Sequence, residues 1–409
     1  MSAYFKARDM AAHQITDLDT QLLRRTLRTT TSPCDTKARV DQRELKAFCS
    51  NDYLGLANHP ELVSALAEGA KRYGVGSGAS HLISGHSVAH DLLEKKLAAC
   101  ESKYIPDARA LFFSTGYLAN INAITGLSKL ANQGEVSIYS AKLNHASLID
   151  GVRLASSQTK AKVTLFDHQN LDFLEEVLQQ DTHPLKLIVV DGVFSMDGDI
   201  APVKNLLDLA EQYDALLMVD DAHGFGVLGE HGYGILEQSD VHSERIIYIG
   251  TLGKAAGVSG AFICAASPFI EWLIQKGRPY IYSTATPPAI AHTLLTSLEL
   301  IEGKEGIARR KQLNQLIQIW RDEMTFQRWE KTPSSTPIQP VILGSNASAL
   351  AAAKLLDAAG YWIPAIRPPT VPVGSSRLRI TFSANHSVDD LRELIKTLQV
   401  IEQEVKSNL

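Results

Sequence analysis

The chain has 409 residues, of which 45% are hydrophobic and 21% are charged, and its formal net charge is -5 at pH 7. This length is too great for one small core and predicts two or three domains, while the acidic balance argues against nucleic acid as the main partner. The scattered cysteines exclude a disulfide framework, no apolar run reaches the ~18 residues that span a bilayer, and no signal peptide is recognisable, so we expect a cytoplasmic protein.

The first part of the chain, residues 1–55, is predicted to be an N-terminal arm. Apolar residues recur at helical spacing over 15–23, and the polar stretch 29–33, which ends in a proline, breaks any helix. A further helix is predicted over 60–73. The segment 74–85 is rich in glycine and serine, but its glycines follow a helix and not a strand, which argues against a dinucleotide-binding loop.

Helix-like stretches alternate with short apolar runs over 56–295, which we expect to form a large domain. Such runs between helices are typical of a mostly parallel sheet covered by helices, the sheet of an α/β protein. The predicted helices cover 92–99, 120–130, 171–179 and 203–213. The predicted strands cover 110–113, 136–139, 163–166, 187–190, 216–219, 246–249 and 261–264.

The last part of the chain, residues 296–409, is predicted to form a smaller C-terminal α/β domain. A long helical region is expected over 289–324, and a polar, proline-bearing loop over 330–337. Beyond the loop, strands are predicted near 340–343, 361–366 and 378–382, and helices near 347–359 and 388–401.

Polar and reactive side chains follow the predicted strands of the large domain. Open α/β sheets bind their ligands beyond the carboxyl ends of the strands, so these side chains are candidates for one site. A structural accident explains one or two such strand ends, but hardly all of them. The small-residue turn at the first of them also opens a helix, whose N-terminus would suit a phosphate. The candidates are Gly116, Tyr117, His145, Ser195, Asp220, His223, Thr251 and Lys254.

A lysine, an acid and a histidine together are the set that an enzyme dependent on pyridoxal 5'-phosphate (PLP) needs. Lys254 would hold the aldehyde covalently as a Schiff base, Asp220 would keep the pyridinium nitrogen protonated, and a histidine would stack on the ring. Taken alone, Lys254 would more often be an ordinary surface lysine, and Asp220 a helix cap. The whole set favours PLP as the cofactor.

Three histidines in and just after the glycine-rich region are candidate metal ligands. His86 and His90 are four residues apart, and His81 precedes them. No neighbouring acidic cluster is placed to complete a site, so we expect no metal.

The chain resembles the α-oxoamine synthases, class II aminotransferase-like PLP enzymes of fold type I, along nearly its whole length. One departure is Ala255-Ala256 after the lysine, where the family often has an aromatic residue or glycine; it does not touch the reactive positions. The motifs that carry the resemblance are Ser50–Leu56, Gly76–Gly78, Asn144–Ser147, Gly192–Gly198, Val219–Gly224, Thr251–Lys254 and Gly257–Gly260.

The resemblance implies the condensation of an amino acid with an acyl thioester, with loss of CO2. The segments 366–372 and 282–284, the latter with Pro287-Pro288, look most like the family member that joins L-alanine to pimeloyl-CoA, or to a pimeloyl carrier-protein thioester, in biotin synthesis. Sister enzymes that use glycine, such as 2-amino-3-oxobutyrate CoA ligase or 5-aminolevulinate synthase, stay as alternatives. A synthase of sphingoid bases or α-aminoketone signals, and an inactive scaffold homologue, are further alternatives.

The roles of the cofactor residues come from the resemblance. Lys254 is expected to remove the Cα proton of the substrate, His145 to stack on the ring, and His223 to hydrogen-bond the phenolic oxygen or the acyl carbonyl. Together with Asp220 they form the expected catalytic set. The residues expected to position the ring and its phosphate are Gly116, Tyr117, Ser195 and Thr251.

The resemblance also implies residues for the substrates and for assembly. Arg379 is expected to clamp the substrate carboxylate, with support from Asn51. Arg24 and Thr370 resemble positions that contact the acyl substrate. Thr284 is expected to reach the phosphate in the partner subunit of a homodimer with shared active sites.

Overall fold

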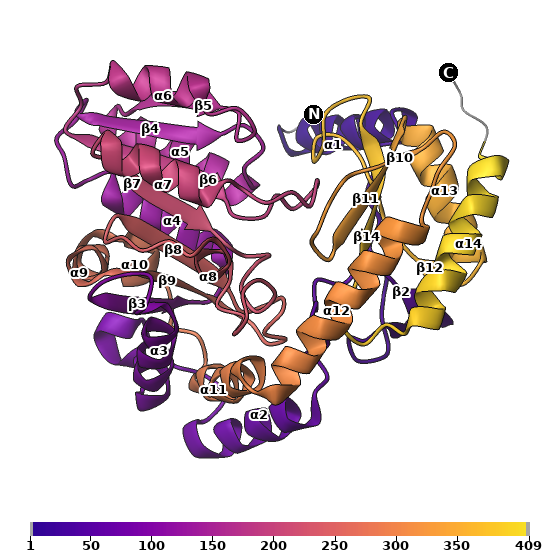
Figure 1. Ribbon diagram of the computed structural model, residues 1–409, viewed down its shortest axis with the longest axis horizontal. Coiled ribbons are helices and arrows are strands. Elements are labelled where there is room, and N and C mark those ends of the chain that lie inside the picture. The colour runs from indigo at the N-terminus through magenta and orange to yellow at the C-terminus, as the bar shows by residue number, and fades with distance from the viewer. Residues whose placement is uncertain (1–2, 406–409) are drawn as a thin grey trace. The chain divides into compact units, whose positions relative to one another are not determined.

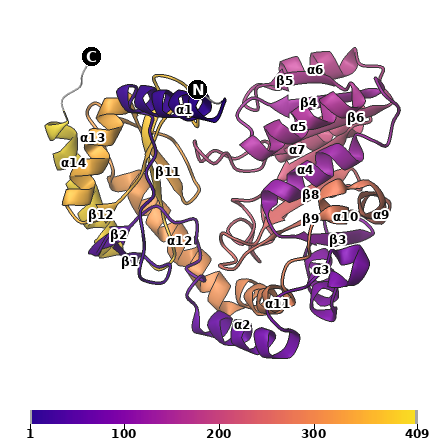
Figure 2. The same ribbon diagram turned by 180° about the vertical axis from the view of Figure 1, so that it is seen from behind.

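The computed structural model describes residues 3–405, which form two compact units, and each unit is described by itself. The larger unit combines Asp52–Ser195 with Asp199–Gln312. The smaller unit combines the N-terminal segment up to Asn51, the short stretch Met196–Gly198 and the segment from Leu313 onward. Figures 1 and 2 show, from opposite sides, the indigo N-terminal strands lying beside C-terminal strands within the smaller unit.

A seven-stranded sheet forms the centre of the larger unit, in the order β3-β9-β8-β7-β6-β4-β5. Strand β9 runs antiparallel to both of its neighbours, and the remaining neighbouring pairs are parallel. The prediction of a mostly parallel sheet is therefore confirmed. Each predicted run is a strand: β3 (Ala108–Phe113), β4 (Val136–Ala141), β5 (Lys162–Phe166), β6 (Leu185–Asp191), β7 (Leu216–Asp220), β8 (Ile246–Thr251) and β9 (Ala261–Ala266).

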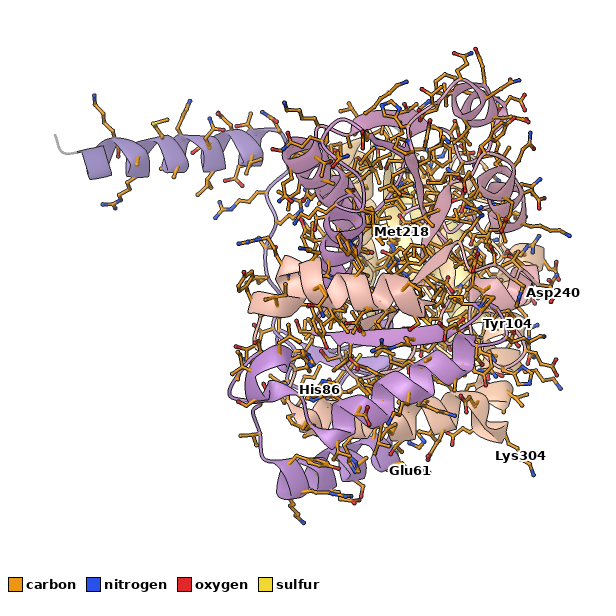
Figure 3. The ribbon with its side chains drawn as sticks, turned by 90° about the vertical axis from the view of Figure 1, so that its left-hand side faces the viewer. Glu61, His86, Tyr104, Met218, Asp240 and Lys304 are labelled. Atoms are coloured by element: carbon orange, nitrogen blue, oxygen red, sulfur yellow. The ribbon has the colours of Figure 1, made fainter. Side chains whose placement is uncertain are left out.

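Both faces of this sheet are buried, which explains why its strands are apolar runs and not alternating ones. Met218, labelled in Figure 3, belongs to the core cluster on one face, which includes residues of α4, α5 and α9. Its neighbours along β7, Leu217 and Val219, point to the other face and are equally buried. Each fully buried side chain of this kind stabilises the fold by about 1.5–3 kcal/mol.

Helices cover the sheet and connect its strands. The predicted helices of this unit are confirmed, with bounds that differ by a few residues. A π-helix, η1 (His81–Gly85), precedes α3. The helices are α2 (Pro60–Tyr73), α3 (Val88–Glu101), α4 (Gly116–Leu127), α5 (Ala146–Thr159), α6 (Asp172–Gln179), α7 (Val203–Gln212), α8 (Ile235–Ser239), α9 (Ser267–Lys276), α10 (Arg278–Tyr282) and α11 (Pro288–Glu302).

The helical region predicted over 289–324 is confirmed, and it consists of two helices. The chain breaks at Gly303 into α11 and α12 (Lys304–Glu323), and Gly303 has extended backbone angles. A Cβ atom at Gly303 would lie 2.9 Å from the carbonyl oxygen of Glu299, so the break tolerates little beyond glycine. The charged residues around Gly303 favour a helix, so the sequence pattern did not reveal the break.

Two small sheets form the smaller unit, one with the order β10-β11-β14-β13 and one with the order β1-β2-β12. The strand predicted over 361–366 is instead two short strands in different sheets, because Pro364 lies between them and lacks the N–H that a ladder needs. The loop predicted over 330–337 begins with the short strand β10. The elements are α1 (Ala3–Thr20), β1 (Lys37–Val40), β2 (Arg43–Ala47), β10 (Glu330–Lys331), β11 (Ile338–Gly344), α13 (Asn346–Ala358), β12 (Tyr361–Trp362), β13 (Ala365–Ile366), β14 (Ser376–Thr381) and α14 (Val388–Glu404).

Among the described helices, none is long and apolar enough to cross a membrane.

Candidate active site

One pocket of the larger unit brings together every cofactor residue expected from the sequence except Thr284. It has a volume of about 170 Å³ and lies at the carboxyl ends of the strands. Thr284 is exposed and its backbone pairs with Ser80. The pocket is lined by Gly116, Tyr117, Asn120, His145, Ser147, Asp191, Ser195, Asp220, Ala222, His223, Thr251 and Lys254.

Lys254 heads a short chain of polar contacts at this pocket. Its Nζ lies 2.8 Å from Nε2 of His223, and Nδ1 of His223 lies 2.6 Å from the hydroxyl of Tyr53. When the ammonium group donates to Nε2, the ring carries its proton on Nδ1 and donates it to Tyr53. These contacts therefore fix the orientation of the His223 ring and give the Lys254 ammonium group a hydrogen-bond acceptor.

Asp220 is held in place by neighbours on both of its oxygens. Asn120 donates to Oδ2 at 2.6 Å, and the backbone N–H of Ala222 donates to Oδ1 at 3.0 Å. The same Asn120 amide also donates to the hydroxyl of Ser147 at 2.8 Å. A carboxylate with this support has one orientation, as a partner for a pyridinium nitrogen requires.

Asp191 lies directly beside Asp220, because the two residues are register partners on β6 and β7. Burial raises the pKa of Asp191 well above its ordinary value, and the neighbouring Asp220 raises it further. Burial therefore favours the protonated form of Asp191 beside Asp220. Asp191 also accepts the backbone N–H of His145 at 2.6 Å, which positions that residue.

His145 is fixed as the N-cap of α5. Its Nδ1 accepts the backbone N–H of Ser147 at 3.2 Å and lies 2.7 Å from the Ser147 hydroxyl. Burial lowers the pKa of His145, so the ring is neutral at neutral pH. A neutral, fixed imidazole suits stacking on an aromatic ring.

The residues of this pocket fit PLP. The strongest support for this fit is the N-terminus of α4, where a phosphate group could bind. A Cβ atom at Gly116 would lie 2.9 Å from the Thr251 hydroxyl oxygen, so the space above this helix N-terminus exists because residue 116 is glycine. The first N–H groups of α4 form an anion site of the kind that holds a phosphate. The Tyr117 hydroxyl donates to Asp150 on α5.

Four residues at this pocket were not predicted as site residues: Asn120, Ser147, Asp191 and Ala222. Asn120 lies one turn inside α4, Ser147 is the second residue of α5, and Asp191 ends β6. Asp191 had a usable signal, because it directly follows the apolar run over 187–190.

The expected substrate residues belong to the smaller unit. Arg379 is buried on β14, and its Nη1 donates to Oδ1 of Asn51 at 3.1 Å, so the structure brings these two residues together. Arg24 forms an ion pair with Asp19 at 2.8 Å and does not contact Thr370.

The guanidinium that reaches Thr370 belongs to the next residue, Arg25. Its Nη2 lies 3.3 Å from the Thr370 hydroxyl. Arg25, Thr370 and Arg367 line a pocket of about 280 Å³ that contains no acidic side chain. Arg367 donates to the backbone carbonyls of Leu22 and Arg24, and its buried Nε has no hydrogen-bond partner in the described part of the chain.

Fold and pocket define a PLP-dependent enzyme of fold type I. The chain belongs to the aminotransferase class I and II family, whose model matches residues 44–398, and within it to the 8-amino-7-oxononanoate synthases. It is 54% identical over 391 residues to the 8-amino-7-oxononanoate synthase of Janthinobacterium sp. (strain Marseille). That match covers 96% of this chain and 97% of the relative.

Solved structures give the same result. A variant of serine palmitoyltransferase from S. paucimobilis, with a bound PLP–myriocin aldimine, matches with a TM-score of 0.87 and 25% identity over 99% of both chains. The 8-amino-7-oxononanoate synthase of Francisella tularensis matches with a TM-score of 0.72 and 28% identity, covering 88% of this chain and 98% of that one. The predicted fold type, the resemblance to α-oxoamine synthases and the PLP cofactor are therefore confirmed.

Proposed function

We propose that this chain catalyses the PLP-dependent condensation of L-alanine with a pimeloyl thioester. The products are 8-amino-7-oxononanoate, CO2 and the free thiol, in a step of biotin synthesis. The observation that carries the proposal is the single pocket that contains Lys254, Asp220, His145 and His223 in a chain of this family.

Lys254, His223 and Asp220 each have a separate role in the proposed reaction. When bound, PLP supplies an electron sink for the carbanion that forms at the substrate Cα. Lys254 Nζ takes up the Cα proton, and His223 Nε2, 2.8 Å away, is placed to exchange that proton with it. Asp220, aligned by Asn120, holds positive charge at the ring nitrogen.

Arg379 supplies a fixed guanidinium for the amino-acid carboxylate. Its hydrogen bond to Asn51 orients the guanidinium plane, and a planar fork can bind a carboxylate through two parallel hydrogen bonds. This role stays a prediction from the family resemblance, and the buried position of Arg379 supports it.

We assign the contact with the acyl carboxylate to Arg25 and Thr370 instead of Arg24. Arg24 is paired with Asp19, whereas Arg25 and Arg367 line a pocket without an acidic side chain. Burial and the neighbouring Arg25 lower the pKa of Arg367, which indicates that an anion would be favourable there. The free carboxylate of a pimeloyl chain is such an anion.

The remaining parts of the proposal rest on the family resemblance or on the sequence. These are a homodimer with shared sites, a contact of Thr284 with the partner subunit's phosphate site, a cytoplasmic location, and a reaction without a metal. The choice between CoA and a carrier protein as the thiol also belongs here. A carrier protein would require basic docking residues, for which the candidates are Arg24, Arg25 and Arg28, or Lys276 and Arg278.

The activity is tested with the purified holoenzyme and paired substrates. L-Alanine with pimeloyl-CoA is expected to give 8-amino-7-oxononanoate by mass spectrometry and one equivalent of free thiol. Lys254→Ala, the matched control, is expected to give neither. Turnover of glycine with a short acyl-CoA instead would assign the chain to a sister activity, and a protein without visible cofactor absorbance would contradict the PLP chemistry.

A further inference from the structure

Three histidines outside the active site converge in the larger unit. One ring nitrogen from each of His81, His86 and His90 lies within 4.8 Å of the others. His81 begins η1, His86 follows its last residue, and His90 lies in the first turn of α3. His86 is labelled in Figure 3, in the segment that leads into α3. The proposed reaction uses none of them.

The separation of two of these nitrogens is close to that of metal ligands. Nδ1 of His81 lies 2.9 Å from Nδ1 of His86. Two imidazoles on one tetrahedral Zn²⁺, with bonds of about 2.0–2.1 Å, have nitrogens roughly 3.3 Å apart. A small movement of exposed His86 would therefore make room for an ion in place of the proton that the two rings share.

The opposite nitrogen of His90 has the kind of partner that metal-binding histidines have. Nε2 of His90 donates to the backbone carbonyl of Thr286 at 2.7 Å, which leaves the lone pair on Nδ1. Ligating histidines usually donate their second N–H to a carbonyl or carboxylate in this manner. Nε2 of His86 lies 4.0 Å from the carboxyl of Glu94, which is longer than a hydrogen bond, so Glu94 would become its partner only after His86 moves. Glu94 is the acid that the fold places near this cluster.

The backbone holds the cluster in this arrangement. A Cβ atom at Gly85 would lie 2.1 Å from the carbonyl oxygen of Ala79, so only glycine permits the π-turn that brings His81 back beside His86. The His81 ring also stacks on Tyr280, with ring centroids 4.8 Å apart.

We propose that His81, His86 and His90 bind one transition-metal ion, with Zn²⁺ as the first candidate and Glu94 as outer support. Imidazole ligands suit Zn²⁺ better than the hard cations Mg²⁺ and Ca²⁺. Binding at His90 exchanges the hydrogen bond from the Ser87 N–H, which caps α3, for a bond to the ion. The ion ties η1 to α3 and takes no part in the condensation.

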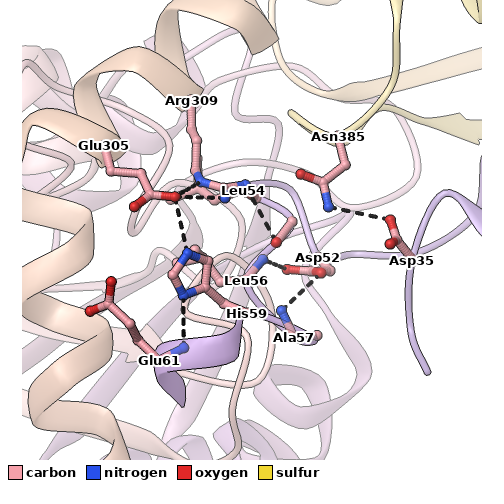
Figure 4. A network of polar contacts seen from close by, with 11 residues as sticks. Asp35, Asp52, Leu54, Leu56, Ala57, His59, Glu61, Glu305, Arg309 and Asn385 are labelled. Carbon is pink, nitrogen blue, oxygen red and sulfur yellow. Dashed lines mark hydrogen bonds and ion pairs between the residues drawn. The ribbon is translucent and has the colours of Figure 1, made fainter. Parts of the chain in front are cut away.

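A second group of possible ligands does not support a site. His59, Glu61 and Glu305 also lie close together. Figure 4 shows that Glu305 is already occupied, because Nη2 and Nε of Arg309 donate to the oxygen that faces His59, at 2.7 and 2.9 Å. A cation there would displace an ion pair, whereas the three-histidine cluster contains no competing cation.

The metal site is tested by titrating metal-free holoenzyme with Co²⁺, read by its visible ligand-field absorbance, and with Zn²⁺ in competition with a chromophoric indicator. One ion per chain is expected, with affinity more than tenfold weaker in His81→Ala and in His86→Ala. His13→Ala, which removes an exposed histidine of α1, is the matched control and is expected to bind normally.

Two outcomes would overturn the proposal. One is the absence of a stoichiometric Co²⁺ spectrum. The other is equal Zn²⁺ affinity in His86→Ala and His13→Ala, which would identify adventitious surface binding. Visible absorbance of the bound cofactor, recorded for each variant, shows that the protein is folded. Because His86 is exposed, His86→Ala is expected to fold. It therefore tests the proposal even if His81→Ala does not fold.

Discussion

At the scale of single residues, burial favours the neutral form of Asp191, which lies beside Asp220. We expect Asp191→Asn to retain activity within about tenfold, because burial raises the pKa of Asp191 and an amide resembles a neutral carboxyl. Asp220→Asn is expected to lower kcat by at least about 100-fold, since it removes the charge opposite the ring nitrogen. Steady-state product formation measures both variants, and equal losses would contradict the assignment of charge.

Adjacent arginines in the N-terminal segment provide a second matched pair. Arg25→Met is expected to raise KM for pimeloyl-CoA about tenfold and to leave KM for heptanoyl-CoA, which lacks the terminal carboxylate, unchanged. Arg24→Met removes a guanidinium that is paired with Asp19, and its kinetics are expected to match the unmodified protein. A larger effect of Arg24→Met than of Arg25→Met would restore the expectation drawn from the sequence.

At the scale of elements, the start of α4 is specialised for an anion. Gly116→Ala would place a methyl group 2.9 Å from the Thr251 hydroxyl oxygen, in the space that the phosphate requires. We expect PLP affinity to fall about tenfold or more, while the far-ultraviolet circular dichroism stays unchanged. Equilibrium dialysis against PLP measures the first quantity.

The strands of the larger unit were predictable because burial on both faces makes them continuous apolar runs. The residues that follow these strands then indicated most of the residues that line the pocket. Strands β1 and β2 were not predicted, since their buried residues alternate with exposed charged ones over only four and five positions. The sequence did not identify Asn120 and Ser147 as pocket residues, because their contacts depend on how α4 and α5 pack together. Glu94 likewise becomes a neighbour of His86 only through the fold.

At the scale of the whole molecule, one buried acid is expected to shape the dependence of stability on pH. Glu101 is fully buried, and neither of its carboxyl oxygens has a hydrogen-bond partner among the described residues. Burial raises its pKa well above the ordinary 4.5, with Asp221 contributing next. The folded chain then holds a proton that the unfolded chain releases above about pH 4.5, so stability falls as pH rises, by about 1.4 kcal/mol per pH unit.

We therefore expect Glu101→Leu to be more stable than the unmodified protein at pH 8, with a smaller difference at pH 5. Urea unfolding at the two pH values measures this difference. Glu101→Gln, which removes the charge but keeps a buried polar group, is expected to lose the pH dependence without the full gain in stability. An equal gain at both pH values would show that packing, not ionisation, is responsible.

The two units are each assembled from separate stretches of chain. The smaller unit combines three segments, and the larger unit lies between them in the sequence. The bounds expected from the sequence, 1–55, 56–295 and 296–409, stay a prediction about which parts fold on their own.

The pairing of β2 with β12 has a consequence for the order of events during translation. Ala47 and Trp362 are strand partners, yet 315 residues separate them (362 minus 47). At a synthesis rate of about 5–20 residues per second, β2 leaves the ribosome roughly 15–60 s before its partner exists. During that interval one edge of the β1–β2 hairpin stays open, and a nascent chain with an open edge is a substrate for chaperones and a hazard for aggregation.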